Sequence, residues 1–158
     1  MDWILAILLF LHVGGAILAF GPLYSLMLLR PMAIAEPAHA NFAIRYQRRV
    51  GSRLIIPLAV LQGITGLLIV WRVGFELLTR GWLIVAIVLY LIALAIAFAV
   101  VLPSSRRLDE LTSGPRPEGA PPGPPPEFVI VARRARMASM ANATLVLVIV
   151  FLMVTKPF

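Results

Sequence analysis

The stretch GWLIVAIVLYLIALAIAFAVVL, residues 81–102, carries no charged side chain from end to end. A helix needs roughly 20 mainly apolar residues to cross about 30 Å of hydrocarbon, and this stretch is long enough to do so. Charge returns only at its flanks, with Arg80 before it and Arg106 after it. We therefore predict a membrane-spanning helix at this place in the chain.

Three further stretches of similar character lie on either side of it, at residues 3–29, 54–71 and 137–154. The whole chain of 158 residues is 61% hydrophobic and 13% charged, whereas a soluble domain has about 45–50% apolar and about 25% charged residues. The sequence thus predicts an all-α polytopic membrane protein, a single domain over residues 1–158 built as a four-transmembrane-helix bundle. No length remains for a separate soluble enzyme module.

The basic residues are distributed unevenly between the two sides of these spans. Three of the 14 lie on one side, namely Arg72, Arg80 and Lys156. The other side holds the remaining eleven, namely Arg30, Arg45, Arg48, Arg49, Arg53, Arg106, Arg107, Arg116, Arg133, Arg134 and Arg136. Loops rich in Arg and Lys stay in the cytoplasm. We therefore predict a protein of the bacterial inner membrane with both termini outside, where Trp3, Trp71 and Trp82 would form an aromatic belt.

The net charge of +7 does not indicate nucleic-acid binding, because the arginines form clusters beside apolar spans. We expect these clusters to lie among anionic lipid headgroups; docking of a cytoplasmic partner or of haem propionates is the alternative. The chain has no cysteine, which excludes disulfides, thiolate catalysis, iron–sulfur clusters and Cys-ligated zinc. The N-terminus lacks a basic region and a cleavage site, so the first span is expected to be a retained anchor.

Residues 113–126, SGPRPEGAPPGPPP, form a predicted cytoplasmic linker because so many prolines prevent a helix. The sequences FAIRYQRR from Phe42 and FVIVARRAR from Phe128 both follow an acidic residue and a proline, and both lead into a span. This likeness indicates two duplicated helical hairpins related by an axis along the membrane normal. Convergence is the rival explanation, since arginine suits any cytoplasmic helix start.

His12 is the one chemically distinctive residue of the spans. Counted from Trp3 at 1.5 Å per residue, it lies roughly 13 Å deep, near the middle of the bilayer. An ionisable group at that depth usually faces a partner, a cavity or a cofactor. Gly15 and its small neighbours allow a flat ring or a second helix to come close. Two interpretations remain open: an axial ligand of haem iron, or a neutral histidine hydrogen-bonded to another helix.

Gln62 and Thr65 in the second span and Tyr90 in the third are predicted at a similar depth. Gln62 and Thr65 share a helix face because they are three residues apart. With His12 they are expected to form one polar layer, either a cofactor or quinone pocket or a set of hydrogen bonds between helices. A second histidine ligand for haem b is missing from the spans, because the only other histidine is His39 in a connecting segment. A haem would therefore need a Met, a Tyr or an open position on its other side, or a histidine from another subunit.

Other chemistry finds no support in the sequence. Every Asp and Glu is predicted to lie outside the spans, which argues against a proton-coupled transporter. Phosphate-binding loops, zinc-protease motifs and a Ser-His-Asp set are not present. Small-residue seams suggest partnership with other membrane subunits or with a second copy of the chain. These seams are Ala86, Ala93 and Ala97 in the third span, and Ser139 and Ala143 in the fourth.

Three short motifs resemble small bacterial four-helix membrane families. FLHVGGA from Phe10 is similar to their histidine-bearing first helix, and LQGITG from Leu61 is similar to a second-helix segment. The ending MVTKP from Met153 resembles the terminus of an uncharacterised group of predicted integral membrane proteins. The pattern is also similar to that of HemJ-like and CopD-like proteins.

The resemblance implies several functions. In HemJ-like proteins the first-helix histidine is linked to haem binding and protoporphyrinogen oxidation, together with an intramembrane lysine; here the only lysine is Lys156. The leading hypothesis is a membrane protein without catalytic activity, binding haem b and serving as an accessory or electron-transfer subunit, with His12, Gly15, Gln62, Thr65 and Tyr90 around the cofactor. A HemJ-type oxidoreductase and a component of metal or solute transport are the alternatives, although a copper role favours more Met and His than this chain has.

Overall fold

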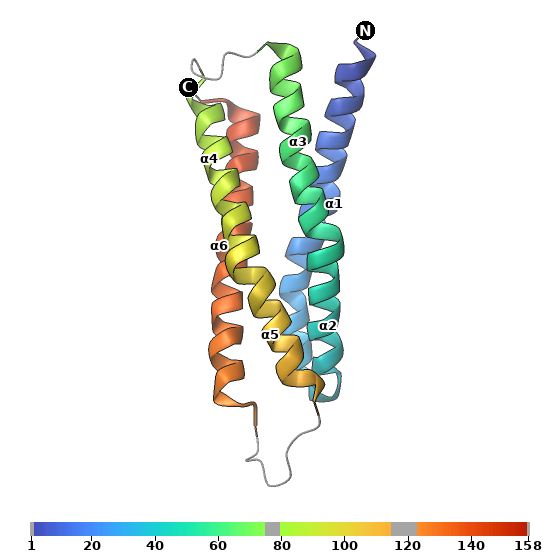
Figure 1. The fold of residues 1–158 in the computed structure, drawn as a ribbon, viewed down its shortest axis with the longest axis vertical. Helices are drawn as coiled ribbons and strands as arrows, with labels where there is room; N and C mark the ends of the chain where they lie inside the picture. The colour runs from blue at the N-terminus through green and yellow to red at the C-terminus, as the bar shows by residue number, and fades with distance from the viewer. Residues whose placement is uncertain (1, 75–79, 115–122, 158) are drawn as a thin grey trace.

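Four long helical rods lie side by side in the computed structural model, which describes residues 2–74, 80–114 and 123–157 (Figure 1). Within these residues the regular structure is helical, and each rod is long and apolar enough to cross a membrane. The predicted four-helix class is thereby confirmed. The elements in order are α1 (Trp3–Ala35), the 3₁₀ turn η1 (Pro37–His39), α2 (Ala40–Val50), the π-helical η2 (Gly51–Ile55), α3 (Ile56–Val73), α4 (Gly81–Ile96), the π-helical η4 (Ala97–Val101), α5 (Leu102–Ser113) and α6 (Pro126–Thr155).

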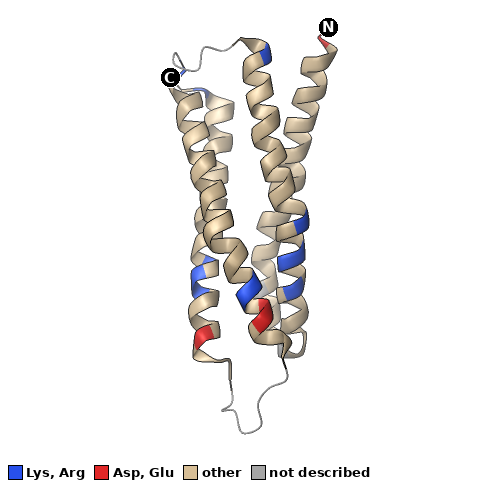
Figure 2. Cartoon of the chain, in the orientation of Figure 1, with Lys and Arg blue, Asp and Glu red and all other residues tan. Residues whose placement is uncertain are grey.

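The rods are longer than the predicted spans. A helix of 33 residues, such as α1, is about 50 Å long, while the hydrocarbon is about 30 Å thick. The surplus lies at the end where the arginines gather (Figure 2). The segments predicted as loops between spans are therefore mostly helix: α2 continues through η2 into α3, and α4 continues through η4 into α5. Hydropathy marks the part of a helix that lipid covers, and says little about where the helix ends.

The Pro-rich segment agrees with its predicted limits. Helix α5 ends at Ser113 and α6 begins at Pro126, and residues 115–122 of the predicted linker lie outside the described residues. Pro126 suits the first turn of α6 because its missing N–H has no partner to lose there. Two other prolines, Pro22 and Pro31, lie inside α1, which continues past both to Ala35.

The rods form two hairpins. Helix α1 packs along α3, and α4 packs along α6; the two pairs meet chiefly through α2 and α5 near the arginine-rich end (Figure 1). Two tyrosines also connect the hairpins. The hydroxyl of Tyr24 on α1 donates to the carbonyl of Ala143 on α6 at 3.0 Å, and the hydroxyl of Tyr90 on α4 donates to the carbonyl of Ala59 on α3 at 2.9 Å.

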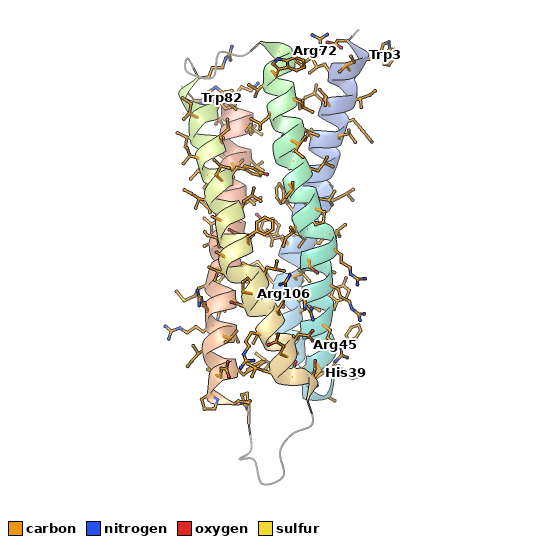
Figure 3. All side chains as sticks on the ribbon, viewed as in Figure 1. Trp3, His39, Arg45, Arg72, Trp82 and Arg106 are labelled. Carbon is orange, nitrogen blue, oxygen red and sulfur yellow. The ribbon has the colours of Figure 1, made fainter. Side chains whose placement is uncertain are left out.

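The two ends of the bundle differ in character (Figure 3). Trp3, Arg72 and Trp82 lie at one end, here called the tryptophan end, and His39 and Arg45 lie toward the other, the arginine end. This division agrees with the two sides that the sequence predicts. Which end faces the cytoplasm stays a prediction from the arginine distribution.

Ion pairs and one cation–π contact join the helices at both ends. At the tryptophan end Asp2 caps α1 through the Leu5 amide and pairs with Arg72 at 2.7 Å, so α1 is tied to α3. The ammonium of Lys156 lies 5.9 Å from the ring centroid of Trp82. At the arginine end, Arg48 of α2 pairs with Asp109 of α5.

Burial is sparse among the described residues, and it includes small as well as large side chains. Ala19, Ala86 and Ala143 are buried, so the predicted seams at Ala86 and Ala143 are used within the chain, where they let helices approach closely. Trp3 and Trp71 are 70% and 78% exposed, as an aromatic belt requires, but Trp82 is only 5% exposed. The expected belt of three tryptophans is therefore corrected to two, because Trp82 packs inside the bundle.

Candidate functional site

Helix α3 buries only polar side chains among its residues, Gln62 and Thr65. They are three residues apart and therefore lie on the same face, as predicted. Water is absent from the hydrocarbon, so polar groups turn toward neighbouring helices, where they find partners. The polar layer of the bundle is built around this face.

His12 of α1 meets Thr65 directly. Its Nδ1 lies 3.0 Å from Oγ1 of Thr65. The Thr65 hydroxyl also lies 2.9 Å from the carbonyl of Leu61, to which it donates. A hydroxyl has one proton, so with that proton on Leu61 the oxygen accepts, and Nδ1–H of His12 donates. Neutral His12 is then unprotonated at Nε2.

The His12 ring also has the backbone of Gln62 as a hydrogen-bonding neighbour, and no contact among the described residues is assigned to Nε2. Its lone pair is therefore available to a metal ion or a donor from outside the α1–α3 pair. A histidine held through one nitrogen by a fixed acceptor, with the other nitrogen free, has the arrangement of a metal-ligating imidazole.

Three glycines make room for this layer. A Cβ at Gly66 would lie 3.1 Å from Cε1 of His12, and a Cβ at Gly15 would lie 3.1 Å from Oε1 of Gln62. A Cβ at Gly63 would overlap the hydroxyl of Tyr90. The predicted closeness at Gly15 is present, but the space is filled by the chain's own side chains.

Tyr90 brings the second hairpin into contact with the layer. Its hydroxyl lies over Gly63 and donates to the carbonyl of Ala59, one turn away on α3. Among the described residues it forms no hydrogen bond to His12. The four predicted residues thus lie in one region as two neighbouring contacts, His12 with Thr65 and Tyr90 with α3.

Gln62 completes the layer with an unused acceptor. Its Oε1 is buried without a hydrogen-bond partner in the described structure, and it lies against the backbone of Gly15. A Cα–H of glycine offers such an oxygen a weak contact, which recurs at close helix crossings. Asn142 of α6 has a similarly unpartnered Oδ1.

Comparison with known proteins places the whole bundle in one family. A family model described as "Predicted integral membrane protein (DUF2269)" matches residues 6–157. The chain belongs to the DUF2269 family. No curated protein and no solved structure gives a significant match.

The DUF2269 match confirms the resemblance to an uncharacterised group of membrane proteins. It spans His12, the polar face of α3 and the ending at Lys156, the three places that carry the resemblance. The family description names the membrane and no activity, so the chemistry of the layer has to be argued from the residues themselves.

A haem bound in the polar layer of this DUF2269 protein would have one histidine available as a ligand. The second histidine, His39, lies at the arginine end and binds the carboxylate of Glu36 at 3.1 Å, far from His12 along α1. The described residues contain no group of three His, Cys, Asp or Glu side chains that would hold a bare metal ion. A single imidazole with a free Nε2 fits the proximal ligand of haem iron, which needs one protein donor.

Two structural residues were not identified from the sequence. Asp109 was expected outside the helices, yet it is buried on α5 at 8% exposure and accepts from both Arg48 and Ser113. Tyr24 links α1 to α6. The signals available were a tyrosine inside an apolar span for Tyr24 and an acid close after two arginines for Asp109.

Proposed function

We propose that this DUF2269 protein binds one haem b through Nε2 of His12 and serves as an accessory or electron-transfer subunit of a membrane complex. The hydrogen bond between His12 and Thr65 carries the proposal, because with Nδ1–H as its donor the neutral ring keeps the lone pair of Nε2 for a ligand. Bound haem would supply a one-electron couple. The chain itself would hold the imidazole in one orientation.

The surrounding residues have positioning roles. Thr65 would fix the tautomer and angle of His12, and Gly66 would let the ring lie against α3. Gly15, Gln62 and Tyr90 keep α1, α3 and α4 close around it. A rigid ligand loses little freedom on binding, which favours affinity. None of these groups is a nucleophile or a general base placed near an open substrate site, so no catalysis is assigned to the chain itself.

The oxidoreductase alternative is less well supported. It calls for a lysine within the membrane, whereas Lys156 follows the last residue of α6 and lies over Trp82 at the tryptophan end. Metal or solute transport has no supporting observation, because the ionisable side chains of the described spans, apart from His12 and the tyrosines, lie toward the ends (Figure 2).

An absorption experiment tests the proposal. The protein is purified in detergent from cells supplied with a haem precursor, and the reduced-minus-oxidised spectrum is recorded. We expect a Soret band and an α-band that His12→Ala abolishes and that His39→Ala leaves intact. Because only one protein ligand is available, the reduced form should also bind carbon monoxide. A wild-type protein without a Soret band would overturn haem binding.

A second variant separates ligation from folding. Thr65→Val keeps the shape of the side chain and removes the acceptor for Nδ1–H, and loss of such an outer partner typically lowers cofactor affinity about 10–100-fold. Thr65→Ser keeps the hydroxyl and should bind as the wild type does. If Thr65→Val and Thr65→Ser bind haem equally, Thr65 does not orient His12 and the positioning role assigned to this hydrogen bond is wrong.

A further inference from the structure

A basic pocket lies at the arginine end, apart from the polar layer. It has a volume of about 230 Å³ and is lined by Arg45, Arg48, Arg49, Ser52, Arg53 and Asp109. The first five residues follow one face of α2 and η2, at helical spacings of three and four. Asp109 faces them from α5. Four arginines and one aspartate give the lining a net charge of +3, four minus one.

The charges of this pocket are not balanced within the described residues. Arg48 pairs with Asp109, but Arg45, Arg49 and Arg53 have no carboxylate within ion-pair distance there. These three arginines are four residues apart, a spacing at which like charges repel one another on a helix. An anion between them would replace repulsion by attraction, and guanidinium groups bind phosphate with paired hydrogen bonds.

The depth of the pocket indicates where the anion comes from. Counted from Trp71 at 1.5 Å per residue, Arg53 lies roughly 27 Å and Arg49 roughly 33 Å along the rod. The hydrocarbon is about 30 Å thick, so the two arginines stand on either side of the level where headgroups begin. The pocket volume of about 230 Å³ compares with roughly 30 Å³ per water molecule in the liquid, which leaves room for a phosphate and its ester group.

We infer that this pocket holds the phosphate of one anionic phospholipid at the arginine end of the bundle. Arg45, Arg49 and Arg53 would bind the phosphate, while Asp109 would keep Arg48 turned toward α5. Binding at this site differs from the general attraction of basic loops to a charged membrane surface, because the phosphate would enter a defined pocket lined by residues of α2, η2 and α5. It does not depend on haem binding.

Native mass spectrometry of the detergent-solubilised full chain tests this inference. The probes are phosphatidylglycerol and phosphatidylcholine with the same acyl chains. We expect one phosphatidylglycerol to be retained per chain, and phosphatidylcholine to be retained at least tenfold less. Arg45→Gln/Arg49→Gln should lower phosphatidylglycerol binding about thirtyfold, since each basic residue near an anionic lipid contributes roughly a factor of five.

The matched control removes the same charge elsewhere. Arg133 and Arg134 are exposed on α6 and have no ion-pair partner among the described residues. Arg133→Gln/Arg134→Gln should change the binding less than about threefold, because long-range attraction alone is screened at ordinary ionic strength. All four arginines are exposed, so neither variant should disturb folding. Equal losses in the two double variants would overturn the pocket.

Two further arms complete the test. Asp109→Asn removes the only acid of the pocket and should raise phosphatidylglycerol retention about fivefold; a fall in retention in folded protein would contradict the inference. Inorganic phosphate and glycerol 3-phosphate are added as soluble competitors. We expect neither to displace the lipid at equal concentration, because acyl chains hold it in the micelle. Complete displacement would assign the pocket to a soluble phosphate and overturn the lipid.

Discussion

Gly63 of α3 leaves the space into which the Tyr90 side chain of α4 fits. A Cβ at position 63 would lie 2.8 Å from Cζ of Tyr90 and would overlap its hydroxyl. The same hydroxyl donates to the carbonyl of Ala59. One missing methyl group thus permits the hydrogen bond that joins the second hairpin to the first in the middle of the membrane.

Replacing that glycine should loosen the bundle. We expect Gly63→Ala to lower the free energy of unfolding in detergent by about 1–3 kcal/mol, the usual effect of overpacking. Gly14→Ala is the matched control, because a Cβ at Gly14 meets nothing within 4 Å and alanine favours a helix. Thermal unfolding followed by circular dichroism measures both. Equal stability of the two variants would show that Tyr90 does not occupy the space over Gly63.

The tautomer of His12 can be measured directly. The chain has two histidines, so His39→Gln leaves His12 as the only imidazole in a ¹⁵N-labelled protein. We expect nitrogen NMR shifts of a neutral ring protonated at Nδ1, because Thr65 accepts from that nitrogen. In the Thr65→Val background the signal should move toward the Nε2–H form. A wild-type ring protonated at Nε2 would contradict the assigned bond and the free lone pair.

The Arg48–Asp109 pair should hold the hairpins together at the arginine end. The Asp109 side chain is 12% exposed and that of Arg48 is 42% exposed, so the pair lies between a surface bridge worth less than about 1 kcal/mol and a buried one whose disruption costs about 3–5 kcal/mol. We expect Arg48→Gln to cost about 1–2 kcal/mol of unfolding free energy. Arg107→Gln, which breaks exposed pairs with Glu127 and Glu110, should cost less.

A double-variant cycle isolates this interaction. The variant that combines Arg48→Gln with Asp109→Asn should lose less unfolding free energy than the two single variants lose in total, because no unpaired charge is then left behind. Chemical unfolding in mixed micelles provides the free energies. Strict additivity would mean that the two side chains do not interact in solution.

The orientation of the bundle follows from labelling of single cysteines. The natural chain has none, so Pro157→Cys at the tryptophan end and Gly114→Cys after α5 each provide one exposed thiol. If the arginine end is cytoplasmic, a membrane-impermeant maleimide should label Pro157→Cys in intact spheroplasts and label Gly114→Cys only after lysis. The reverse pattern would invert the predicted topology.

Much of the fold was predictable because hydrocarbon imposes a simple rule. Long uncharged stretches such as residues 81–102 have few other uses, and all four predicted spans coincide with apolar helices. This rule applies only to the part of each helix that lies within the hydrocarbon. Helix α2, with its run of arginines, has the charge of a loop but the structure of a helix, since water tolerates both and only packing against α5 decides between them.

The polar layer was predictable in its members and less so in its bonds. Depth counting brought His12, Gln62, Thr65 and Tyr90 to one level, because helices rise by a constant amount per residue. It did not show that Thr65 receives the proton of His12, or that Tyr90 reaches Ala59. Those choices depend on the rotation of each helix about its axis, which a nearly uniform apolar surface does not encode.

The predicted duplication of the hairpins stays a prediction, and the two tyrosine contacts do not test it. Tyr24, on the first helix of one hairpin, donates to the second helix of the other, and Tyr90 does the same in return. A twofold axis along the membrane normal would keep equivalent contacts at one depth, whereas Tyr24 lies much farther from the start of α1 than Tyr90 does from the start of α4.

The polar contacts between the two hairpins are distributed unevenly along the bundle. At the tryptophan end, the Asp2–Arg72 pair joins helices of the same hairpin, and the contacts between hairpins described above lie at mid-depth or, as with Arg48 and Asp109, at the arginine end. The chain itself also joins the hairpins at the tryptophan end, because α3 ends at Val73 and α4 begins at Gly81. The polar fastening between the hairpins is thus unequal along the bundle, and substitutions at the Arg48–Asp109 pair should change the spacing of the hairpins mainly at the arginine end.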